Sequence, residues 1–372
     1  MKKLFSLALV VSTAALVNSV FAFAKYVDIT TTYAGGDVTD FPVLVKITTT
    51  TPTGFYSDVK NAGADLKFTD ANGNGDYPYE IDTWNASGDS YIWVKLPKLS
   101  AGMTFRMYYG DEDQTQPTNP ATAVWTGYER VLHASEAKDS AKGAATALCE
   151  GGRLTDGPIG NGYGQTTSGG KASIECELAE HNRTQFTVSV WMKMNVALPG
   201  WVAILGPRNN ATAACWGLSS TTKSLRVNVA GKDSGLCNDF KTEGLVSSDK
   251  WSKLDIVYND LTTSLYCDGV LVEQPFTTTK PAQRVQFSGG GTITWMYFGG
   301  VGDAQKLDGS GLSGSGIGAD FDECRILNEP ADAARVAADY QTVANVATFL
   351  EFGDPQGGGP TVQVLPQGVI VK

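Results

Sequence analysis

The sequence has 372 residues, a net charge of −10 and no cluster of basic residues. An acidic chain of this kind argues against binding to nucleic acid and to anionic membranes. The chain has short runs of β-branched and aromatic residues, and its 42 glycines and 15 prolines favour turns between them. This pattern predicts an all-β protein of two domains.

Residues 1–24 have the features of a secretory signal peptide. Lys2 and Lys3 form the charged start, residues 4–17 the apolar core, and Ala22-Phe23-Ala24 a cleavage site. The apolar core is shorter than the ~20 residues that a spanning helix needs. We therefore expect an exported protein (secreted, periplasmic or at the cell surface) that is cleaved near Ala24 and has no transmembrane segment.

Residues 25–122 are expected to form a small β-sandwich with no cysteine. The predicted strands are residues 26–32, 41–48, 65–68, 79–84, 91–96 and 104–109. This segment resembles a bacterial domain family of unknown function that commonly precedes a laminin-G-like jelly roll. The resemblance is carried by the runs Pro42-Val43-Leu44-Val45, Pro78-Tyr79-Glu80-Ile81 and Met107-Tyr108-Tyr109-Gly110. This resemblance implies no chemistry. The prolines of residues 116–120 then predict a short, stiff linker.

Residues 251–274 contain the clearest strand pattern of the second half. Leu254, Ile256 and Tyr258 alternate with Lys253, Asp255 and Val257, the period of a half-buried strand. Asp268-Gly269 then lies between two apolar runs, which predicts a two-residue hairpin turn. This stretch is expected to contribute three strands to one sheet.

The same stretch resembles the laminin-G-like, concanavalin-type jelly roll. That family has a Trp, an alternating strand and a Leu-Tyr-x-Asp-Gly hairpin, and its closing strand is similar to Phe321-Asp322-Glu323-Cys324-Arg325-Ile326. The resemblance implies a jelly roll over residues 123–353. It leaves the function open, because the fold hosts lectins, adhesive modules and enzyme appendages.

The end of the second domain is expected to contain one short helix. Asn328 is a candidate N-cap before Pro330, and Val336, Tyr340 and Val343 fall on one stripe. About three turns should pack against the edge of the sandwich. Residues 354–372 are expected to be a flexible tail.

The sequence does not favour an enzyme. Glu80-Ile81-Asp82 begins like the Glu-Ile-Asp-x-x-Glu motif of jelly-roll glucanases, but Asn85 takes the third acidic position. Retaining hydrolysis needs both a nucleophile and an acid, so exposed strand carboxylates are the favoured interpretation. The two histidines, His133 and His181, are too few for multi-histidine chemistry and are expected to be structural.

Six cysteines in an exported chain predict three disulfides, all in the second domain. In the jelly-roll family the positions of Cys267 and Cys324 are usually apolar, so the resemblance implies that these two are bonded to each other. Proximity in sequence then pairs Cys149 with Cys176 and Cys215 with Cys237, a weaker choice among many pairings.

The sequence offers candidate residues for two ligand sites. Many relatives carry a calcium ion, and Asp139, Asp320 and Asp322 are the nearest acids for one at the rim of the jelly roll, although their spacing does not require it. Trp201, Trp216 and Trp295 are candidates for stacking on sugar rings, while a core position is favoured for any single one of them.

The sequence thus predicts an exported, non-enzymatic binding or adhesion protein that recognises glycan or another surface polymer. One alternative is a structural component of an envelope or matrix without a ligand pocket. The other is an accessory or degenerate carbohydrate-active enzyme, for which a facing carboxylate pair is needed.

Overall fold

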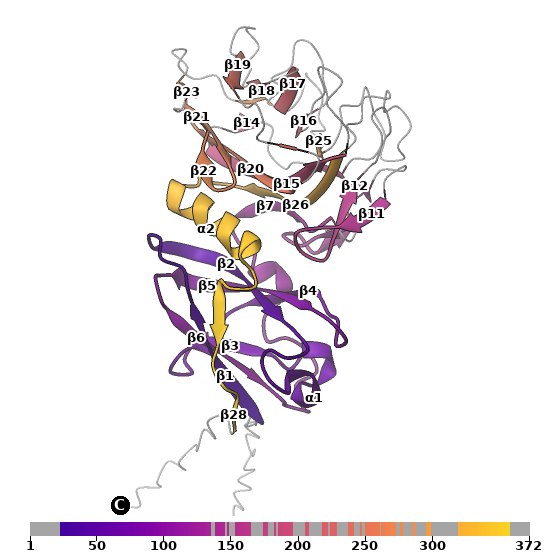
Figure 1. Cartoon of the computed structure of the whole chain (residues 1–372), viewed down its shortest axis with the longest axis vertical. Helices are drawn as coiled ribbons and strands as arrows, with labels where there is room; N and C mark the ends of the chain where they lie inside the picture. Colours follow the sequence, from indigo (N-terminus) through magenta and orange to yellow (C-terminus); the bar gives the residue numbers. More distant parts are fainter. Residues whose placement is uncertain are drawn as a thin grey trace, which may run out of the picture.

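The protein consists of two β-rich domains with a helix between them (Figure 1). The computed structural model describes residues 23–134, 138–145, 147–148, 153–164, 174–177, 182–183, 185–195, 205–207, 218–221, 224–228, 237–241, 246–247, 250–260, 262–272, 276–277, 285–286, 295–298 and 319–357. Over this part of the chain, every helix is too short or too polar to cross a membrane.

The first domain is a sandwich of two antiparallel sheets. Its six strands lie where the sequence predicts them, with the ends shifted by at most three residues. They are β1 (Lys25–Thr31), β2 (Val38–Ile47), β3 (Lys67–Asp70), β4 (Tyr79–Thr83), β5 (Ser90–Leu99) and β6 (Thr104–Tyr109). Two short turns of helix, α1 (Phe55–Asp58) and η1 (Asn61–Gly63), connect β2 to β3. Buried side chains such as Phe41, Phe68 and Phe105 fill the space between the sheets.

The last strands of the described chain belong to this first domain. β27 (Leu350–Phe352) and β28 (Gln356–Gly357) both pair antiparallel with β1. One sheet therefore has the order β27-β1-β6-β3, and the other has the order β2-β5-β4. The second domain is thus an insertion in the first. The sequence predicts a jelly roll up to residue 353, but the second domain ends before β27. Of the predicted tail, residues 354–357 include β28, and residues 358–372 lie outside the described part.

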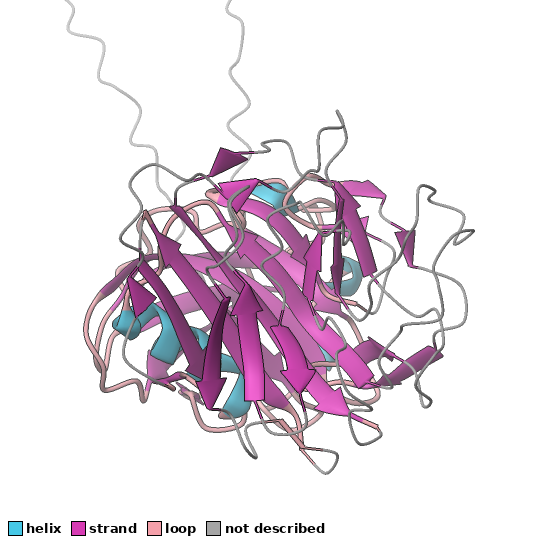
Figure 2. Ribbon diagram, turned by 90° about the horizontal axis from the view of Figure 1, so that it is seen from above, coloured by secondary structure: helices cyan, strands magenta, loops and turns pink. Residues whose placement is uncertain are grey.

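The second domain is organised around a sheet with the order β11-β12-β26-β15-β20-β21-β22. Figure 1 shows this sheet edge on, and Figure 2 shows the strands of the molecule face on, from above. Its strands are β7 (Tyr128–Leu132), β11 (Arg153–Asp156), β12 (Asn161–Gly164), β15 (Gln185–Met194), β20 (Ser252–Asn259), β21 (Thr262–Cys267), β22 (Val270–Leu271), β23 (Phe276–Thr277) and β26 (Ala319–Leu327). β7 pairs with β26 and β23 with β21. The predicted meander of residues 251–274 is confirmed, with Asp268 and Gly269 both at positive φ in the hairpin turn.

Shorter strands complete the described part of this domain. They are β8 (Lys138–Asp139), β9 (Ala144–Ala145), β10 (Ala147–Leu148), β13 (Ile174–Glu177), β14 (Asn182–Arg183), β16 (Leu205–Pro207), β17 (Leu218–Thr221), β18 (Ser224–Asn228), β19 (Cys237–Lys241), β24 (Val285–Gln286) and β25 (Trp295–Phe298). A 3-10 turn, η2 (Ala121–Ala123), connects the two domains.

Helix α2 (Ala333–Ala344) lies between the two domains. Its N-cap is Asp332, which accepts a hydrogen bond from the backbone of Arg335, whereas the sequence had suggested Asn328. The predicted stripe faces inward: Val336 and Val343 are buried, and Tyr340 stacks on Trp191 of the sheet. On the side of the first domain, the hydroxyl of Thr342 accepts a hydrogen bond from the backbone of Leu44.

Because of this packing, both faces of the central sheet are buried. Lys253 and Asp255, which the sequence placed on a solvent face, have 2% and 1% of their surface exposed. Leu44 and Trp93 of the first domain share one apolar cluster with Val131 of the second and Val336 of the helix. The domains are therefore joined by a continuous core.

Candidate functional site

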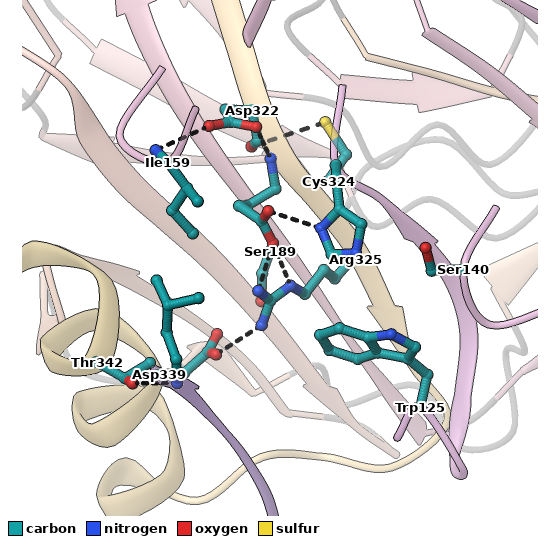
Figure 3. A network of polar contacts seen from close by, with 12 residues as sticks. Trp125, Ser140, Ile159, Ser189, Asp322, Cys324, Arg325, Asp339 and Thr342 are labelled. Carbon is teal, nitrogen blue, oxygen red and sulfur yellow. Dashed lines mark hydrogen bonds and ion pairs between the residues drawn. The ribbon is translucent and has the colours of Figure 1, made fainter. Parts of the chain in front are cut away.

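Charged side chains gather where the first domain meets the polar face of the central sheet (Figure 3). Glu80 and Asp82 come from β4 of the first domain, His133 follows β7, and Glu323 and Arg325 lie on β26. All except Asp82 are buried. We call this group the junction cluster.

Glu80 occupies the middle of the boundary and accepts hydrogen bonds on both carboxylate oxygens. Trp125 donates to Oε2, while Ser140 and Lys138 donate to Oε1 at 2.7 and 2.9 Å. The imidazole Nε2 of His133 lies 3.4 Å from Oε2. Glu80 is thus enclosed by the second domain and is not the exposed strand carboxylate that the sequence suggested.

A chain of alternating charges runs from His133 into the jelly roll. Its Nδ1 lies 2.7 Å from Oε1 of Glu323, and Oε2 of Glu323 accepts from Arg325 at 3.0 Å. Arg325 also donates to Asp339 of α2 at 2.9 Å, and Asp339 pairs with Lys253 at 2.9 Å. Every ion in this series has an oppositely charged neighbour, which is the condition under which buried charges are tolerated.

Aromatic rings from both domains cover the cluster. The guanidinium of Arg325 lies 4.3 Å from the ring centre of Trp93 and 4.9 Å from that of Trp125. The ring of His133 is also stacked with Trp93. Such rings stabilise a cation and exclude water, so the interactions within the cluster act in a medium of low polarity.

Asp82 differs from its neighbours because its carboxylate accepts no hydrogen bond from any residue that the structure describes. The pairing of β4 with β5 skips one residue between Ile81 and Thr83, so Asp82 is the extra residue of a β-bulge. A bulge turns the side chain away from the regular alternation of the strand. Carboxylate oxygens of Asp82 and Glu323 and a ring nitrogen of His133 lie within 4.8 Å of one another.

Glu323 is also placed by a backbone irregularity. The register of β26 against β15 shifts near this residue, and its φ is +48°. Residues other than glycine seldom take this conformation, and where they do the surrounding structure must enforce it. Ala134, directly after His133, has a φ of +59°. Irregular backbone therefore accompanies all three of the side chains that converge.

The pKa values of these groups are moved in opposite directions. Burial raises the pKa of Asp82 to about 7, with the negative charges of Glu323 and Glu80 adding to the effect and His133 opposing it. Burial also acts on Glu80, but the hydrogen bond and charge of His133, followed by Trp125 and Lys138, lower its pKa to about 2. Although burial opposes it, the carboxylates of Glu323 and Asp82 raise the pKa of His133 well above its ordinary value.

The donor set of the junction cluster suits a cation better than it suits hydrolysis. Asp82, His133 and Glu323 offer one nitrogen and carboxylate oxygens, which are ordinary ligands of zinc and related ions. Hydrolysis of a glycoside would need two carboxylates that can reach a sugar, and Glu80 has 3% of its surface exposed.

The acids predicted to hold calcium do not come together. Asp139 accepts from the backbone of Val131 and Ala141, Asp320 accepts from Asn195 at 2.7 Å, and Asp322 accepts from the backbone of Glu323 at 2.8 Å. Among the residues that the structure describes, the acids that converge are Asp82 and Glu323 of the junction cluster. Each of the three carboxylates predicted for calcium holds local backbone or side chains instead.

The other predicted sites fall mostly outside the described part of the chain. This holds for Trp201, Trp216, Cys149 and Cys215, and for the side chains of Trp295, Cys176 and Cys237. Cys267 lies on β21 and Cys324 on β26, with β15 and β20 between them in the sheet. Neighbouring strands are about 4.8 Å apart, so the two are separated by about 14 Å, twice the reach of a disulfide. The predicted bond between them is therefore not formed.

Comparison with protein families separates the two halves of the chain. Residues 62–134 match the family described as Domain of unknown function (DUF2341), and residues 167–337 match the Concanavalin A-like lectin/glucanases superfamily. The chain combines a DUF2341 domain with a concanavalin A-like domain. This confirms the architecture expected from the sequence, and the junction cluster lies where the DUF2341 domain meets the concanavalin A-like domain.

The chain is also similar to parts of solved structures at low identity. The binding domain of Paraclostridial Mosquitocidal Protein 1 is 15% identical with a TM-score of 0.45 and covers 58% of this chain; this chain covers 52% of it. The receptor binding domain of botulinum neurotoxin D is 14% identical with a TM-score of 0.43, and the coverage is 58% and 52%. The chain thus spans about half the length of each. No curated protein matches the sequence.

Proposed function

We propose that this chain is an exported, non-enzymatic binding protein whose concanavalin A-like domain recognises glycan. The observation that carries the proposal is the match of residues 167–337 to a superfamily of lectins and glucanases. The state of the described carboxylates supports glycan binding, as in a lectin, over hydrolysis, as in a glucanase. The proposal therefore assigns the domain to the lectin side of its superfamily.

The state of Glu80 and Asp82 supports a binding protein over a glucanase. Glu80 is buried under three donors, and its pKa of about 2 keeps it charged. Trp93 and Trp125, which pack beside the cluster, have 0% and 1% of their surface exposed and offer a sugar ring no stacking surface there. A hydrolase would need a nucleophile and an acid on opposite sides of an accessible bond.

The packing of the domains also restricts where glycan would bind. The polar face of the central sheet is covered by the DUF2341 domain and by α2, so a ligand has to contact another part of the concanavalin A-like domain. Trp201, Trp216 and Trp295 belong to that domain by sequence. We propose that at least one of their indole rings stacks on a sugar, because such rings match the apolar face of a pyranose.

A glycan array with the purified protein tests this proposal. We expect binding to a defined group of glycans and at least a tenfold loss of affinity in one of the variants Trp201→Ala, Trp216→Ala or Trp295→Ala. Trp84→Ala is the matched control, because it removes an equally large ring from the DUF2341 domain. A folded protein that binds no glycan would favour a structural role, and release of reducing ends from polysaccharides would favour an enzyme.

A further inference from the structure

We propose that Asp82, His133 and Glu323 form a binding site for a divalent transition-metal ion such as Zn²⁺ at the junction of the two domains. The inference is independent of glycan binding. It rests on the convergence of two carboxylates and one imidazole from β4, β26 and the residue after β7, and on one carboxylate that accepts no hydrogen bond from the described residues.

The three side chains already stand at nearly the spacing that an ion requires. Their donor atoms lie within 4.8 Å of one another, and His133 and Glu323 are buried. Ligands at about 2.1 Å from a tetrahedral ion are about 3.4 Å apart. Small side-chain adjustments are therefore enough to close the shell, with water completing the coordination.

Asp82 provides the observation that is hardest to explain without an ion. Its carboxylate is half-buried, faces Glu80 and Glu323, and accepts no hydrogen bond from the described residues. A carboxylate in such surroundings is costly unless a positive charge or a donor compensates it. The bulge in β4 nevertheless turns this side chain toward the cluster, where a cation would satisfy it.

The surroundings of His133 match those of a metal-binding histidine. Nδ1 and Oε1 of Glu323 are 2.7 Å apart and share one proton, and we place the ion where that proton lies. The other ring nitrogen, Nε2, then donates to Glu80, which Trp125, Ser140 and Lys138 hold in place. A ligating histidine usually donates its second N–H to a carboxylate in this way, which fixes the ring.

The second oxygen of Glu323 is held by Arg325, so the first is oriented toward Asp82 and His133. A nitrogen ligand with carboxylates suits zinc and its neighbours in the first transition series. Calcium prefers a shell of six to eight oxygens. The site should therefore discriminate against calcium. Because Asp82 belongs to the first domain and the other two ligands to the second, the ion would also link the domains.

Calorimetric titration of chelator-treated protein with Zn²⁺ tests the site. We expect one Zn²⁺ per chain, a higher Tm in its presence, and neither effect with Ca²⁺ at the same concentration. Asp82→Asn should weaken Zn²⁺ binding at least tenfold. It should change the Tm of the metal-free protein little, because no hydrogen bond is lost and the repulsion from Glu323 and Glu80 is removed together with the attraction to His133.

The exposed Asp76, which precedes β4, provides the matched control, since Asp76→Asn makes the same change in charge. It should bind Zn²⁺ like the unsubstituted protein. Substitution of Co²⁺ for Zn²⁺ identifies the ligands, because thiolate ligands would give a sulfur-to-cobalt charge-transfer band. The proposal is overturned by an absence of Zn²⁺ binding, by unchanged affinity in Asp82→Asn, or by that charge-transfer band.

Discussion

The indole nitrogen of Trp125 donates a hydrogen bond to Oε2 of Glu80 across the boundary between the domains. Both side chains are buried, with 1% and 3% of their surface exposed. The other oxygen of Glu80 is held by Ser140 and Lys138, also from the second domain. The contact between the domains is therefore built around a carboxylate whose two oxygens both accept hydrogen bonds.

We expect Glu80→Gln to lower the free energy of unfolding by about 3 kcal/mol, because it leaves His133 and Lys138 near a neutral group and turns an amide N–H toward one of the donors. Urea unfolding followed by tryptophan fluorescence measures the change. Glu112→Gln is the control: its carboxylate, 81% exposed, pairs with Lys60 at 3.5 Å, and its loss should cost less than about 0.5 kcal/mol. Equal effects of the two substitutions would contradict the structural role of Glu80.

The pairing of β27 with β1 predicts that the two domains unfold together. Leu350 is buried in the core of the first domain although it follows the second domain in sequence. Leu350→Ala should cost about 2–4 kcal/mol, and calorimetry should show one transition before and after the change. The exposed Val270 offers a control, since Val270→Ala should alter stability by less than about 0.5 kcal/mol. Two separate transitions, or a protease-resistant fragment that begins near Val124, would argue for independent domains.

Asp339 should contribute to an acid-sensitive component of stability. Burial opposes its ionisation, but the charges of Lys253 and Arg325 lower its pKa from 3.8 to about 2. The folded state thus favours the charged carboxylate, and the resulting stabilisation is complete above about pH 4 and lost as the pH falls toward about 2. The free energy of unfolding should decrease less steeply over this range in Asp339→Asn than in the unsubstituted protein. Asp354→Asn, at an exposed position, should keep the original slope; a parallel decrease in all three would refute the assignment.

Peptide mapping without reduction should find no peptide that links Cys267 to Cys324. The two strands that separate them in the sheet place them beyond the geometry of a disulfide. Mapping after reduction and alkylation serves as the control, because it shows that both peptides are recovered. A dominant peptide joining these two residues would mean that the order β26-β15-β20-β21 is incorrect.

The fold was largely predictable because its local signals are strong. The alternation of Leu254, Ile256 and Tyr258 and the turn at Asp268-Gly269 depend on neighbours in sequence, and both were identified correctly. The burial of Lys253 and Asp255 was not predictable in this way. Lys253 pairs with Asp255 beside it and with Asp339, which lies on a helix far along the chain, and polar residues on a strand ordinarily indicate solvent.

The junction cluster could be predicted only in fragments. The sequence singles out Glu80 and the closing strand around Glu323, yet its pattern favours a solvent position for Glu80 and only a structural role for His133. Glu80 and His133 are 53 residues apart, and His133 and Glu323 are 190 apart. Periodicity carries no information on such contacts. The two bulges that turn Asp82 and Glu323 inward are likewise set by strand pairing rather than by local sequence.

The position of β27 has a consequence for the order in which the protein can be completed. During synthesis from the N-terminus, β6 is available to pair with one edge of β1 early. The other edge of β1 has no partner until residues 350–352 have been made, after the whole second domain. An open strand edge is a template for pairing with other chains. Pairing at this edge thus has to wait for residues 350–352, and a chain cut short within the second domain would leave the edge of β1 open to pairing with other chains.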